Sequence, residues 1–464
     1  MLDVRSALFG VSAIADHLHP LDDRRPETLS GQRRLLRKWG NQRAQLHART
    51  KLNPEIVDAR QLELVGRLVD NAFGSIPFYH ELYRAAGFRS GDIVTWEDYN
   101  CLPAITKEDI LRNFEAFTAS RALAPSACYS SRTSGSSGRT LTILQDEAAS
   151  DLGALFYLRH YEQILGRKRE PHEWLYEVYL APPRYSSLDG AFPVFTLSQD
   201  CPIEIAAEHM TRLRPALLAG FPSYFLRLIE VDASLDDAGI GAICTNSESS
   251  TRGERASIAA RFNAPCFDEY SSEELYLIAT ECANGQYHVV EDNVRVDVMN
   301  ADVSGLGEIV ATSIVNQYMP FIRYRQGDVV RLGAGTCACG NKFRTLAAMM
   351  GRADQFLRDK NFSPIPPDRV MALYDRTLIP AAAKIAEFQI VQSELDEIGL
   401  YIIPENGGPN AASISSFTEG LREIFADHSL GIRVETVSEM PPRLSFKRRL
   451  ITCTVAKADK SNRN

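Results

Sequence analysis

The residues best suited to chemistry are grouped in separated motifs, and the first is the loop YSSRTSGSSGRT at 129–140. Glycine permits close approach of the backbone, while hydroxyl and amide groups can surround phosphate oxygens. The loop therefore indicates a polyphosphate-binding segment, with Ser134, Gly135, Ser136, Ser137 and Gly138 as candidate contacts. It lacks the Gly-x-x-x-x-Gly-Lys-Ser/Thr pattern of a Walker P-loop, and taken alone it is also typical of an ordinary surface loop.

Two motifs further along the chain supply carboxylates. FDEYSSEE at 267–274 ends in adjacent glutamates, and a carboxylate suits a hard cation that must bridge phosphate oxygens. Taken alone, this segment equally fits a solvated acidic helix start. RYRQGD at 323–328 ends in Asp328, whose carboxylate can accept hydrogen bonds from the two hydroxyl groups of a cis-diol.

The last two motifs carry basic residues. GRAD at 351–354 contains Arg352, and PRLSFK at 442–447 ends in Lys447, which two arginines follow. A plain turn with a surface arginine and a solvated basic tail are the alternative interpretations. Taken in order along the chain, the motifs favour a protein that activates an acid with ATP.

A separate group of residues has the spacing of a metal site. Cys282 and His288 have five residues between them, and Cys337 and Cys339 have one. Thiolate and imidazole are preferred ligands of tetrahedral Zn²⁺, and four of them close its coordination sphere, so the group predicts a structural zinc site. Free cysteines of the protein core are the alternative, because Cys-x-Cys is a less specific spacing than Cys-x-x-Cys.

Composition limits the class of protein. The chain has 464 residues, 45% of them hydrophobic and 24% charged, which is typical of a soluble globular protein with more than one domain. Its net charge of −8 argues against non-specific binding of nucleic acid or an anionic membrane, because such partners select for a basic field. No apolar run reaches the roughly 18–20 residues that span a bilayer. The nine cysteines are irregularly spaced, which favours a reducing cytoplasm over a disulfide framework.

The elements that must position these motifs alternate between short apolar runs and helical runs. The region 33–73 has apolar residues at helical spacing, and 251–262 has the Ser/Thr start of a helix. Alternation of this kind predicts an α/β fold with a substantial sheet. The expected strands of this part are 216–219, 241–244, 264–267 and 307–312.

The character of the sequence changes after Gly351. A charged segment and the Pro-rich 363–367 predict a linker, and the remainder predicts a small α+β domain. We therefore expect a large N-terminal α/β domain at 1–350 and a small mobile C-terminal lid domain at 351–464, joined by a hinge at 351–360. The expected lid elements are strands at 388–391, 398–403 and 432–437 and a helix at 412–426.

Together the motifs resemble those of the AMP-forming acyl-activating superfamily, which includes acyl- and aryl-CoA ligases, peptide-synthetase adenylation domains and luciferases. The signature loop of that family is similar to 129–140, with Arg139 here in place of its usual Lys. The resemblance is closest to the phenylacetate-CoA ligase-like branch and runs from about residue 60 to about residue 450. The segments that carry it are SIPFY at 75–79, LPAITK at 102–107 and AGFPSY at 219–224.

The resemblance implies a binding site for ATP and Mg²⁺. It implies that Tyr270 stacks on adenine, that Asp328 binds the ribose hydroxyls and that Glu274 helps hold Mg²⁺ in catalysis. The Tyr-Gly-x-Thr-Glu of the family becomes YSSEE here, so the choice between Glu273 and Glu274 as the metal ligand stays open. The other nucleotide-binding candidates are Ser247, Glu248, Asp268, Glu269 and Ser271.

The resemblance also implies moving parts. Arg352 would contact the nucleotide, and Asp354 would absorb the change in backbone dihedral angles as the lid rotates between adenylation and acceptor transfer. Lys447 stands where the family has a mobile catalytic lysine, whose charge stabilises negative charge developing around the α-phosphoryl group. Phe446 replaces the glycine that usually precedes this lysine.

Two further sets of residues follow from the resemblance. The acid pocket would be bracketed by Gly220, Phe221, Tyr224 and Asn246. Some proteins of this branch hold zinc at positions that correspond to the Cys282, His288, Cys337 and Cys339 group.

We therefore predict an ATP-dependent, AMP-forming ligase that adenylates a small, aromatic or short carboxylic acid and transfers it to CoA. The first alternative is an adenylating enzyme of natural-product biosynthesis with an amine or carrier-protein acceptor, or one that activates nitrite to diazotise an aryl amine. The second is a degenerate protein that binds nucleotide and zinc without catalysis. The sequence leaves the oligomeric state open, including a homodimer.

Overall fold

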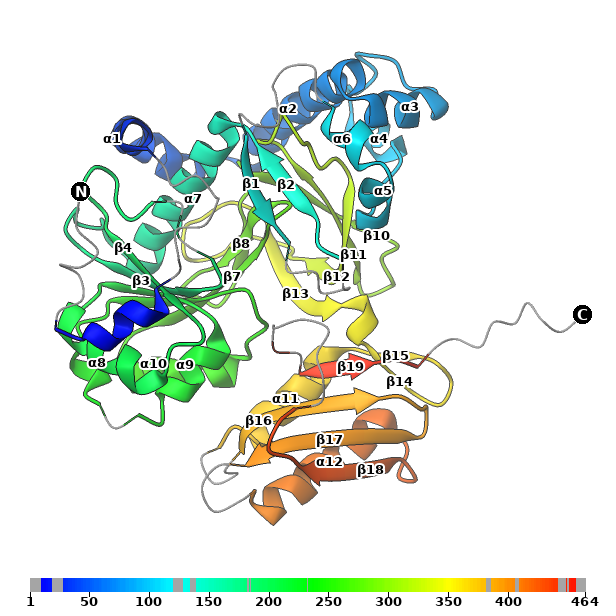
Figure 1. Ribbon diagram of the computed structural model, residues 1–464. Coiled ribbons are helices and arrows are strands. Elements are labelled where there is room, and N and C mark those ends of the chain that lie inside the picture. The colour runs from blue at the N-terminus through cyan, green and yellow to red at the C-terminus, as the bar shows by residue number, and fades with distance from the viewer. Residues whose placement is uncertain are drawn as a thin grey trace, which may run out of the picture.

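The computed structural model describes residues 10–18, 28–119, 128–133, 139–181, 183, 185–231, 233–380, 385–404, 409–440, 448 and 450–455, with only the backbone of Asp354 and Ala386. Within these residues the chain forms two bodies, a large one up to Arg352 and a smaller one after it (Figure 1). The second body, residues 353–455, is called the lid below.

The large body is built on one sheet, which has eleven strands among the described residues. In spatial order these are β10 (Val294–Met299), β11 (Gly307–Ser313), β12 (Tyr324–Leu332), β13 (Thr345–Arg352), β9 (Tyr287–Val289), β8 (Tyr276–Glu281), β7 (Cys266–Ser272), β6 (Ala242–Thr245), β5 (Leu217–Gly220), β3 (Leu175–Tyr179) and β4 (Val194–Ser198).

Strand β7 divides this sheet into two halves of different type. The pairs from β4 through β3, β5 and β6 to β7 are parallel, whereas the pairs from β7 through β8, β9, β13, β12 and β11 to β10 are antiparallel. In the parallel half, helices connect strands that point the same way, so all four loops that follow β3, β5, β6 and β7 leave from one edge. A small sheet of β1 (Tyr129–Arg132) and β2 (Thr142–Gln145) carries the Ser/Gly loop between its strands.

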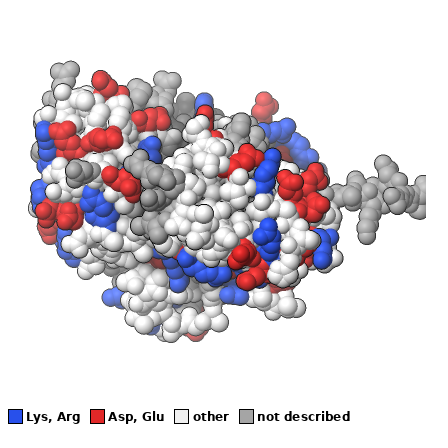
Figure 2. Space-filling view, turned by 90° about the horizontal axis from the view of Figure 1, so that it is seen from below, with Lys and Arg blue, Asp and Glu red and all other residues white. Residues whose placement is uncertain are grey.

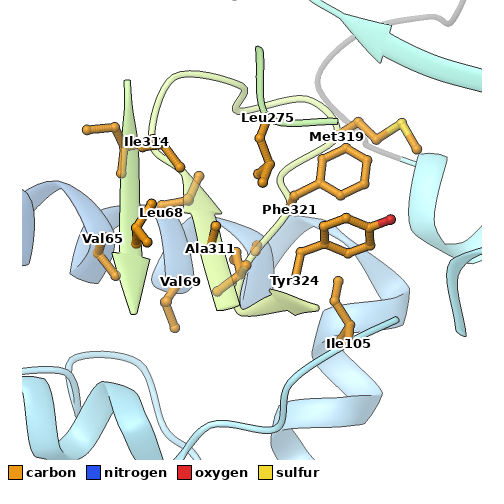
Figure 3. Close-up of a cluster of buried hydrophobic side chains, with 14 of the residues drawn as sticks. Val65, Leu68, Val69, Ile105, Leu275, Ala311, Ile314, Met319, Phe321 and Tyr324 are labelled. Atoms are coloured by element: carbon orange, nitrogen blue, oxygen red, sulfur yellow. The ribbon is translucent and has the colours of Figure 1, made fainter. Parts of the chain in front are cut away.

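Helices cover both halves of the sheet. The amphipathic helix α2 presents Val65, Leu68 and Val69 to the antiparallel half, where they pack in one buried cluster with Ala311 and Ile314 (Figure 3). Each such side chain removed from water contributes roughly 1.5–3 kcal/mol. The helices of this body are α1 (Leu29–Arg49), α2 (Pro54–Ser75), α3 (Pro77–Ala85), α4 (Trp96–Cys101), α5 (Lys107–Arg112), α6 (Phe114–Thr118), α7 (Glu147–Leu165), α8 (Ile203–Leu213), α9 (Pro222–Leu228) and α10 (Arg252–Phe262), with short 3-10 turns η2 (Ser12–His17) and η4 (Leu235–Asp237).

The lid is a small α+β unit with its own apolar core. Its sheet has the order β18 (Gly431–Thr436), β17 (Glu397–Pro404), β16 (Ile385–Gln392) and β19 (Ile451–Cys453). Two helices, α11 (Pro367–Thr377) and α12 (Ala411–Phe425), pack with this sheet. On the lid side, acidic and basic side chains are interspersed around a broad uncharged area (Figure 2).

The segment expected as a linker is folded into the lid. After the 3-10 turn η5 (Ala353–Gln355), strands β14 (Leu357–Arg358) and β15 (Pro364–Ile365) pair as a hairpin. Leu357 and Ile365 are buried in the lid core, and Asp359 accepts hydrogen bonds from the backbone of the turn. Prolines are compatible with this short edge pairing, so the Pro-rich composition does not mark an open linker here.

The predicted fold class is confirmed, because the chain is an α/β body with a large sheet followed by a smaller α+β lid. Among the described residues, no helix combines the length and the hydrophobicity required to cross a bilayer.

Candidate active site

The carboxyl ends of the parallel strands meet at one edge of the sheet, next to β7. Strand β3 ends at Tyr179, β5 ends at Gly220, and Asn246 follows β6. Tyr270 lies toward the carboxyl end of β7. Sheets of this kind bind ligands at the carboxyl ends of strands where the topology changes, so this edge is the candidate active site.

Tyr270, Gln326 and Asp328 form a hydrogen-bonded cluster at this edge. The Tyr270 hydroxyl donates to Oδ2 of Asp328 at 2.6 Å, and Nε2 of Gln326 donates to both of these oxygens at 2.9 Å. Burial raises the pKa of Tyr270 well above its ordinary value, so the hydroxyl keeps its proton at neutral pH. Oδ1 of Asp328 has no hydrogen-bond partner within the described part of the chain and can accept one from a ligand.

Arg352 joins this cluster from the neighbouring strand. It ends β13, opposite Asp328 in the register of the β12–β13 hairpin, and its Nη1 donates to the carbonyl of Gln326 at 3.2 Å. The guanidinium passes over Gly327, where a Cβ would lie 3.1 Å from Nη2. Gly327 has a φ of +92°, which glycine adopts without strain. Tyr270, Asp328 and Arg352, from three separate motifs, are thus brought together.

Glu274 is buried on the side of the site toward the Ser/Gly loop. The hydroxyl of Tyr324 donates to its Oε1 at 3.1 Å, and burial raises the pKa of its carboxyl group. Burial lowers the pKa of Lys107, and the charge of nearby Glu274 opposes this shift. Nζ of Lys107 donates to Oγ1 of Thr133 at 3.1 Å, immediately before the loop 134–138.

Lys107 is a site residue to which the motif pattern assigned no role. Its signal was the segment 102–107, which carries part of the family resemblance. In the structure Lys107 places a positive charge near the buried carboxylate of Glu274 and contacts Thr133, which directly precedes residues 134–138.

Asp268 has its carboxylate turned into the protein. Thr245 donates to its Oδ1 at 2.7 Å and Tyr287 donates to its Oδ2 at 2.8 Å. Burial raises the pKa of Asp268 to about 6, and the charge of Arg255 opposes the shift. Its backbone N–H donates to Glu281 at 3.0 Å, and Glu281 pairs with Arg255. Because protein donors occupy both carboxylate oxygens, Asp268 braces the strands behind the site.

Glu269 points to the opposite face of β7. Ser271 donates to its Oε1 at 3.1 Å, and the thiol of Cys244 lies 3.5 Å from its Oε2. Nε2 of His160 lies 3.4 Å from the same sulfur. Burial raises the pKa of Glu269 to about 7 and lowers the pKa of His160 to about 3. The three side chains therefore form a buried hydrogen-bonded chain in which His160 is neutral at physiological pH.

The acid-pocket candidates divide into two groups. Gly220 has a φ of +148°, and a Cβ there would lie 2.5 Å from the carbonyl of Val178, so only glycine fits. Phe221 stacks on Tyr179 with ring centroids 6.0 Å apart. Asn246 donates from its backbone to Gly220 at 2.9 Å, and its buried Oδ1 has no partner among the residues that the structure describes. These groups line the same edge as Tyr270.

Tyr224 belongs to the second group, because its ring turns into the core of the parallel half. Its hydroxyl donates to the carbonyl of Cys201 at 3.0 Å. A buried tyrosine whose hydroxyl is satisfied by a backbone carbonyl packs the fold behind the site.

Ser247 and Glu248 lie where the large body meets the lid. Ser247 has a φ of +66°, a strained conformation for a residue with a side chain and one that concentrates at functional sites. Oε2 of Glu248 accepts a hydrogen bond from the backbone of Ser223 at 3.4 Å, and its Oε1 accepts one from the backbone of Arg448 at 2.8 Å. The alternative interpretation placed Arg448 in a solvated basic tail, but Arg448 is buried at this junction.

Several predicted residues lie outside the described part of the chain. These are Ser134, Gly135, Ser136, Ser137, Gly138 and Lys447, together with the side chain of Asp354. The described residues nearest to them in sequence are Thr133, Arg139, Arg352 and Arg448.

The predicted zinc ligands are close together in space. The ligand atoms of Cys282, His288, Cys337 and Cys339 all lie within 4.8 Å of one another. The sulfurs of Cys282 and Cys337 are 3.7 Å apart, and the sulfur of Cys339 is 3.3 Å from Nε2 of His288. Ligand atoms about 2.0–2.3 Å from a tetrahedral Zn²⁺ are roughly 3.4–3.8 Å from each other, so the spacing fits this ion. Nδ1 of His288 lies 3.0 Å from the carbonyl of Phe343, which fixes the ring with Nε2 toward the sulfurs.

Comparison with curated proteins finds distant relatives over most of the chain. Protein CapK of Staphylococcus aureus is 23% identical over 398 residues, which are 80% of this chain and 84% of that protein. Phenylacetate-coenzyme A ligase of Escherichia coli K12 is 24% identical over 344 residues, or 68% of this chain and 77% of that protein. No protein-family model matches the chain.

Comparison with solved structures finds the same fold in a coenzyme A ligase. 2-Hydroxyisobutyryl-CoA ligase in the postadenylation state with 2-HIB-AMP has a TM-score of 0.72 at 20% identity, covering 88% of this chain and 91% of that one. The TM-score is 0.62 for an open conformation of the same enzyme and 0.59 for its thioesterification state. The TM-score is therefore higher for the postadenylation state than for these two other structures of the enzyme.

Proposed function

Since the chain is related in sequence to phenylacetate-coenzyme A ligases and has the fold of AMP-forming coenzyme A ligases, we propose that it joins a small carboxylic acid to CoA through an acyl-adenylate. The observation that carries this proposal is the convergence of Tyr270, Asp328 and Arg352 at the sheet edge, facing a lid docked through Arg448. Three distant motifs meeting at one topological switch point support a single nucleotide site.

We assign the nucleotide contacts by the geometry of this edge. Asp328 would bind the ribose hydroxyls with Oδ1, while Tyr270 and Gln326 hold its other oxygen in place. The ring of Tyr270 would stack on adenine, and Arg352 would contact the nucleotide from the strand that leads to the lid. The loop residues Ser134, Gly135, Ser136, Ser137 and Gly138 would surround the phosphates, with Ser247, Glu248 and Ser271 at the rim.

The phosphate side combines a carboxylate with a positive charge. Glu274 keeps Oε2 without a partner among the described residues, so this oxygen can bind Mg²⁺, which would neutralise charge on the phosphates. Glu273 lies near both Tyr179 and Glu274, and its charge adds to the rise of the Glu274 pKa. We therefore assign Glu274 as the metal ligand and Lys107 as a further phosphate contact next to the loop.

The acid would bind between Gly220, Phe221 and Asn246. The stacked rings of Phe221 and Tyr179 favour a flat aromatic acid, and the unpartnered Oδ1 of Asn246 offers an acceptor for a polar substituent. CoA is the proposed acceptor, in keeping with the relatives named as coenzyme A ligases. Amine, carrier-protein and nitrite chemistry have no comparable support and are outcomes of the acceptor test below.

In the first half-reaction a carboxylate oxygen of the acid attacks the α-phosphorus of ATP, and the bond to pyrophosphate breaks. In the second, the CoA thiolate attacks the carbonyl of the adenylate, and AMP leaves. The protein would contribute positioning and charge, with Lys447 stabilising the negative charge that develops around the α-phosphorus. We propose that the hinge predicted at 351–360, between a domain at 1–350 and a lid at 351–464, turns about its first residues around Asp354, because Leu357 is already buried in the lid core.

We propose that the four cysteine and histidine side chains hold a structural Zn²⁺. The fit of their spacing to a tetrahedron and the support of the His288 ring by Phe343 argue for it. Four protein ligands leave no open position for a substrate. All nine cysteines are free thiols, which supports a reducing compartment and our proposal of a cytoplasmic enzyme.

The test is pyrophosphate release from Mg-ATP with a panel of aromatic and short acids, each with CoA, an amine or no acceptor. We expect acid-dependent release, AMP formation that requires CoA, and a loss of about 10²- to 10³-fold in release for Lys447→Ala. Release only with nitrite and an aryl amine would replace the proposal by the diazotisation alternative. Binding of ATP without release for any acid would support the degenerate binding protein.

A further inference from the structure

Arg448 is a lid residue whose polar contacts lie on the large body. Its Nη1 lies 2.8 Å from Oε1 of Glu254, and the two side chains are only 5% and 0% exposed. Its backbone N–H donates to Oε1 of Glu248 at 2.8 Å, and its Nη2 donates to the carbonyl of Ser249 at 3.4 Å. One buried arginine thus binds both helix α10 and the loop after β6.

Glu254 is itself held rigidly. It is the third residue of α10, and its Oε2 accepts a hydrogen bond from the backbone of Thr251 at 2.9 Å in a capping box. The hydroxyl of Tyr374, on the lid helix α11, donates to its Oε1 at 3.2 Å. Gly253 donates from its backbone to Asp375 at 3.2 Å, and a Cβ on Gly253 would lie 2.8 Å from that carboxylate. The lid helix α11 therefore approaches α10 closely at Gly253, and a larger residue there would have to displace the Asp375 carboxylate.

These contacts exist in only one orientation of the lid. Each of them joins residues on opposite sides of the hinge segment, so a rotation there separates all of them at once. A buried ion pair contributes little net stability compared with apolar residues, but it demands one geometry and so can specify one arrangement. Of the three states of the related ligase compared above, the postadenylation state has the highest TM-score to this chain.

The contacts of Arg448 also extend to the candidate active site. Glu248 accepts from Arg448 with one oxygen and from Ser223, next to the acid segment, with the other. Lys447 directly precedes Arg448, and consecutive Cα atoms are about 3.8 Å apart across a trans peptide bond. The backbone of Arg448 is thus fixed against Glu248, in the loop after β6.

We propose that Arg448 is a positioning residue for adenylation. Its ion pair with Glu254 and its backbone bond to Glu248 hold the lid in the orientation in which Lys447 reaches the reacting groups, and both contacts break before the acceptor step. This inference rests on the proposed function. It separates the two half-reactions, since Arg448 supports only the first.

The variants are Arg448→Met, which removes the ion pair, and Gly253→Ala, which crowds the Asp375 carboxylate of the lid without altering Arg448 or Glu254. The double variant Arg448→Met with Glu254→Gln leaves no unpaired buried charge and guards against simple loss of folding. Arg433→Met is the matched control, because Arg433 is a lid arginine whose side chain is 58% exposed. The half-reactions are acid-dependent pyrophosphate–ATP exchange and thioester formation from separately prepared acyl-adenylate and CoA.

We expect exchange to fall about 10²-fold in Arg448→Met and at least about 10-fold in Gly253→Ala, as misplacement of a catalytic group predicts. Thioester formation should stay within about threefold of the wild type in both, and Arg448→Lys should restore part of the exchange. Equal losses in the two half-reactions would reduce Arg448 to a structural role, and undiminished exchange would overturn the proposal.

A second readout needs no substrate. Small-angle scattering of the free protein should give a larger radius of gyration for Arg448→Met than for the wild type or Arg433→Met. An unchanged radius would contradict the docking itself. If the wild type shows no pyrophosphate–ATP exchange with any of the acids, the proposed function is overturned. The scattering result would still decide whether Arg448 holds the lid.

Discussion

The two ends of the β12–β13 hairpin carry different kinds of chemistry. The turn end carries Cys337 and Cys339, which meet Cys282 from the β8–β9 turn and His288 from β9. The open end carries Asp328 and Arg352 in register, with Gly327 between them. At the turn end every ligand atom faces the others, whereas at the open end Asp328 keeps an oxygen for a ligand.

One hairpin can therefore serve stability at one end and ligand binding at the other. A closed set of four ligands has no open position for a further ligand, whereas a carboxylate with a free oxygen can accept a hydrogen bond from one. Changes at the turn end should therefore act on the free energy of unfolding, and changes at the open end should act on the kinetics with ATP.

The largest expected effect is at the turn end. Cys337→Ser should abolish the binding of one equivalent of zinc and lower the free energy of unfolding by about 4 kcal/mol, because metal binding is coupled to folding. That loss corresponds to a fall of roughly 5 °C in the melting temperature of a large domain. Metal analysis and thermal unfolding measure both quantities.

Cys101→Ser is the matched control, since Cys101 is an exposed thiol away from the cluster and should keep full zinc and stability. The folded fraction of Cys337→Ser should retain its KM for ATP within about threefold. A variant that still holds zinc, or one that loses ATP binding as strongly as stability, would break the separation between the two ends.

A pH experiment tests whether Glu269, which is buried behind the open end, is protonated in the folded protein. Glu269 has a pKa of about 7 in the folded protein against an ordinary value of 4.5. The stabilisation from its protonated form is fully present below pH 4.5 and is lost as the pH rises through 7. The free energy of unfolding of Glu269→Gln, relative to that of the wild type, should therefore be about 3 kcal/mol higher at pH 8 than at pH 4. Urea titrations across this range would measure this difference.

Glu308→Gln is a control on the same sheet, since Glu308 pairs with Arg325 at the surface of the antiparallel half. If the stability difference between Glu269→Gln and the wild type does not change with pH, Glu269 is not protonated in the fold. If Glu269→Gln alters the pH dependence of pyrophosphate–ATP exchange rather than that of the free energy of unfolding, Glu269 takes part in the reaction.

At the open end, Asp328→Ala should lower kcat/KM for ATP about 10²-fold, because two hydrogen bonds from ribose to a charged acceptor are lost. Zinc content and melting temperature should stay at wild-type values. Asp302→Ala, which removes an exposed carboxylate on the β10–β11 turn, serves as the control. A comparable loss in Asp302→Ala, or a loss of zinc in Asp328→Ala, would contradict the assignment.

The smallest expected effect is that of Tyr270→Phe. This change keeps the aromatic ring and removes one hydrogen bond of 2.6 Å to Asp328. We expect KM for ATP to rise about fivefold with kcat unchanged, as the loss of about 1 kcal/mol of uniform binding predicts. Steady-state kinetics checks this, and a fall in kcat of more than tenfold would instead make the hydroxyl part of the chemistry.

The sequence predicted the elements whose pattern is local. The runs at 216–219 and 241–244 became β5 and β6, the helix expected at 251–262 became α10, and the lid strands expected at 398–403 and 432–437 became β17 and β18. Each has an apolar run of its own bounded by turn or cap residues, which is the information that a sequence carries directly.

What the sequence could not supply were the tertiary contacts. Arg448 stands in a basic run and has the pattern of a solvated tail, and only the folded lid brings it to Glu254. Tyr224 lies in a motif of the related family, but its hydroxyl finds a backbone carbonyl in the core. The Pro-rich segment 363–367 was expected as a linker, yet Ile365 finds a place in the lid core. In each case a distant partner decided the outcome.

The strand that ends at Arg352 is also the strand from which the lid departs, because η5 begins at the next residue. A lid that turns about this point would pull on β13. The other end of β13 pairs with β9, which carries His288 of the cysteine and histidine cluster. The β12–β13 hairpin would thus be held in place at its turn end, and the rotation would be confined to the few residues after Arg352. Asp328, the proposed ribose ligand, would then keep its position while the lid turns.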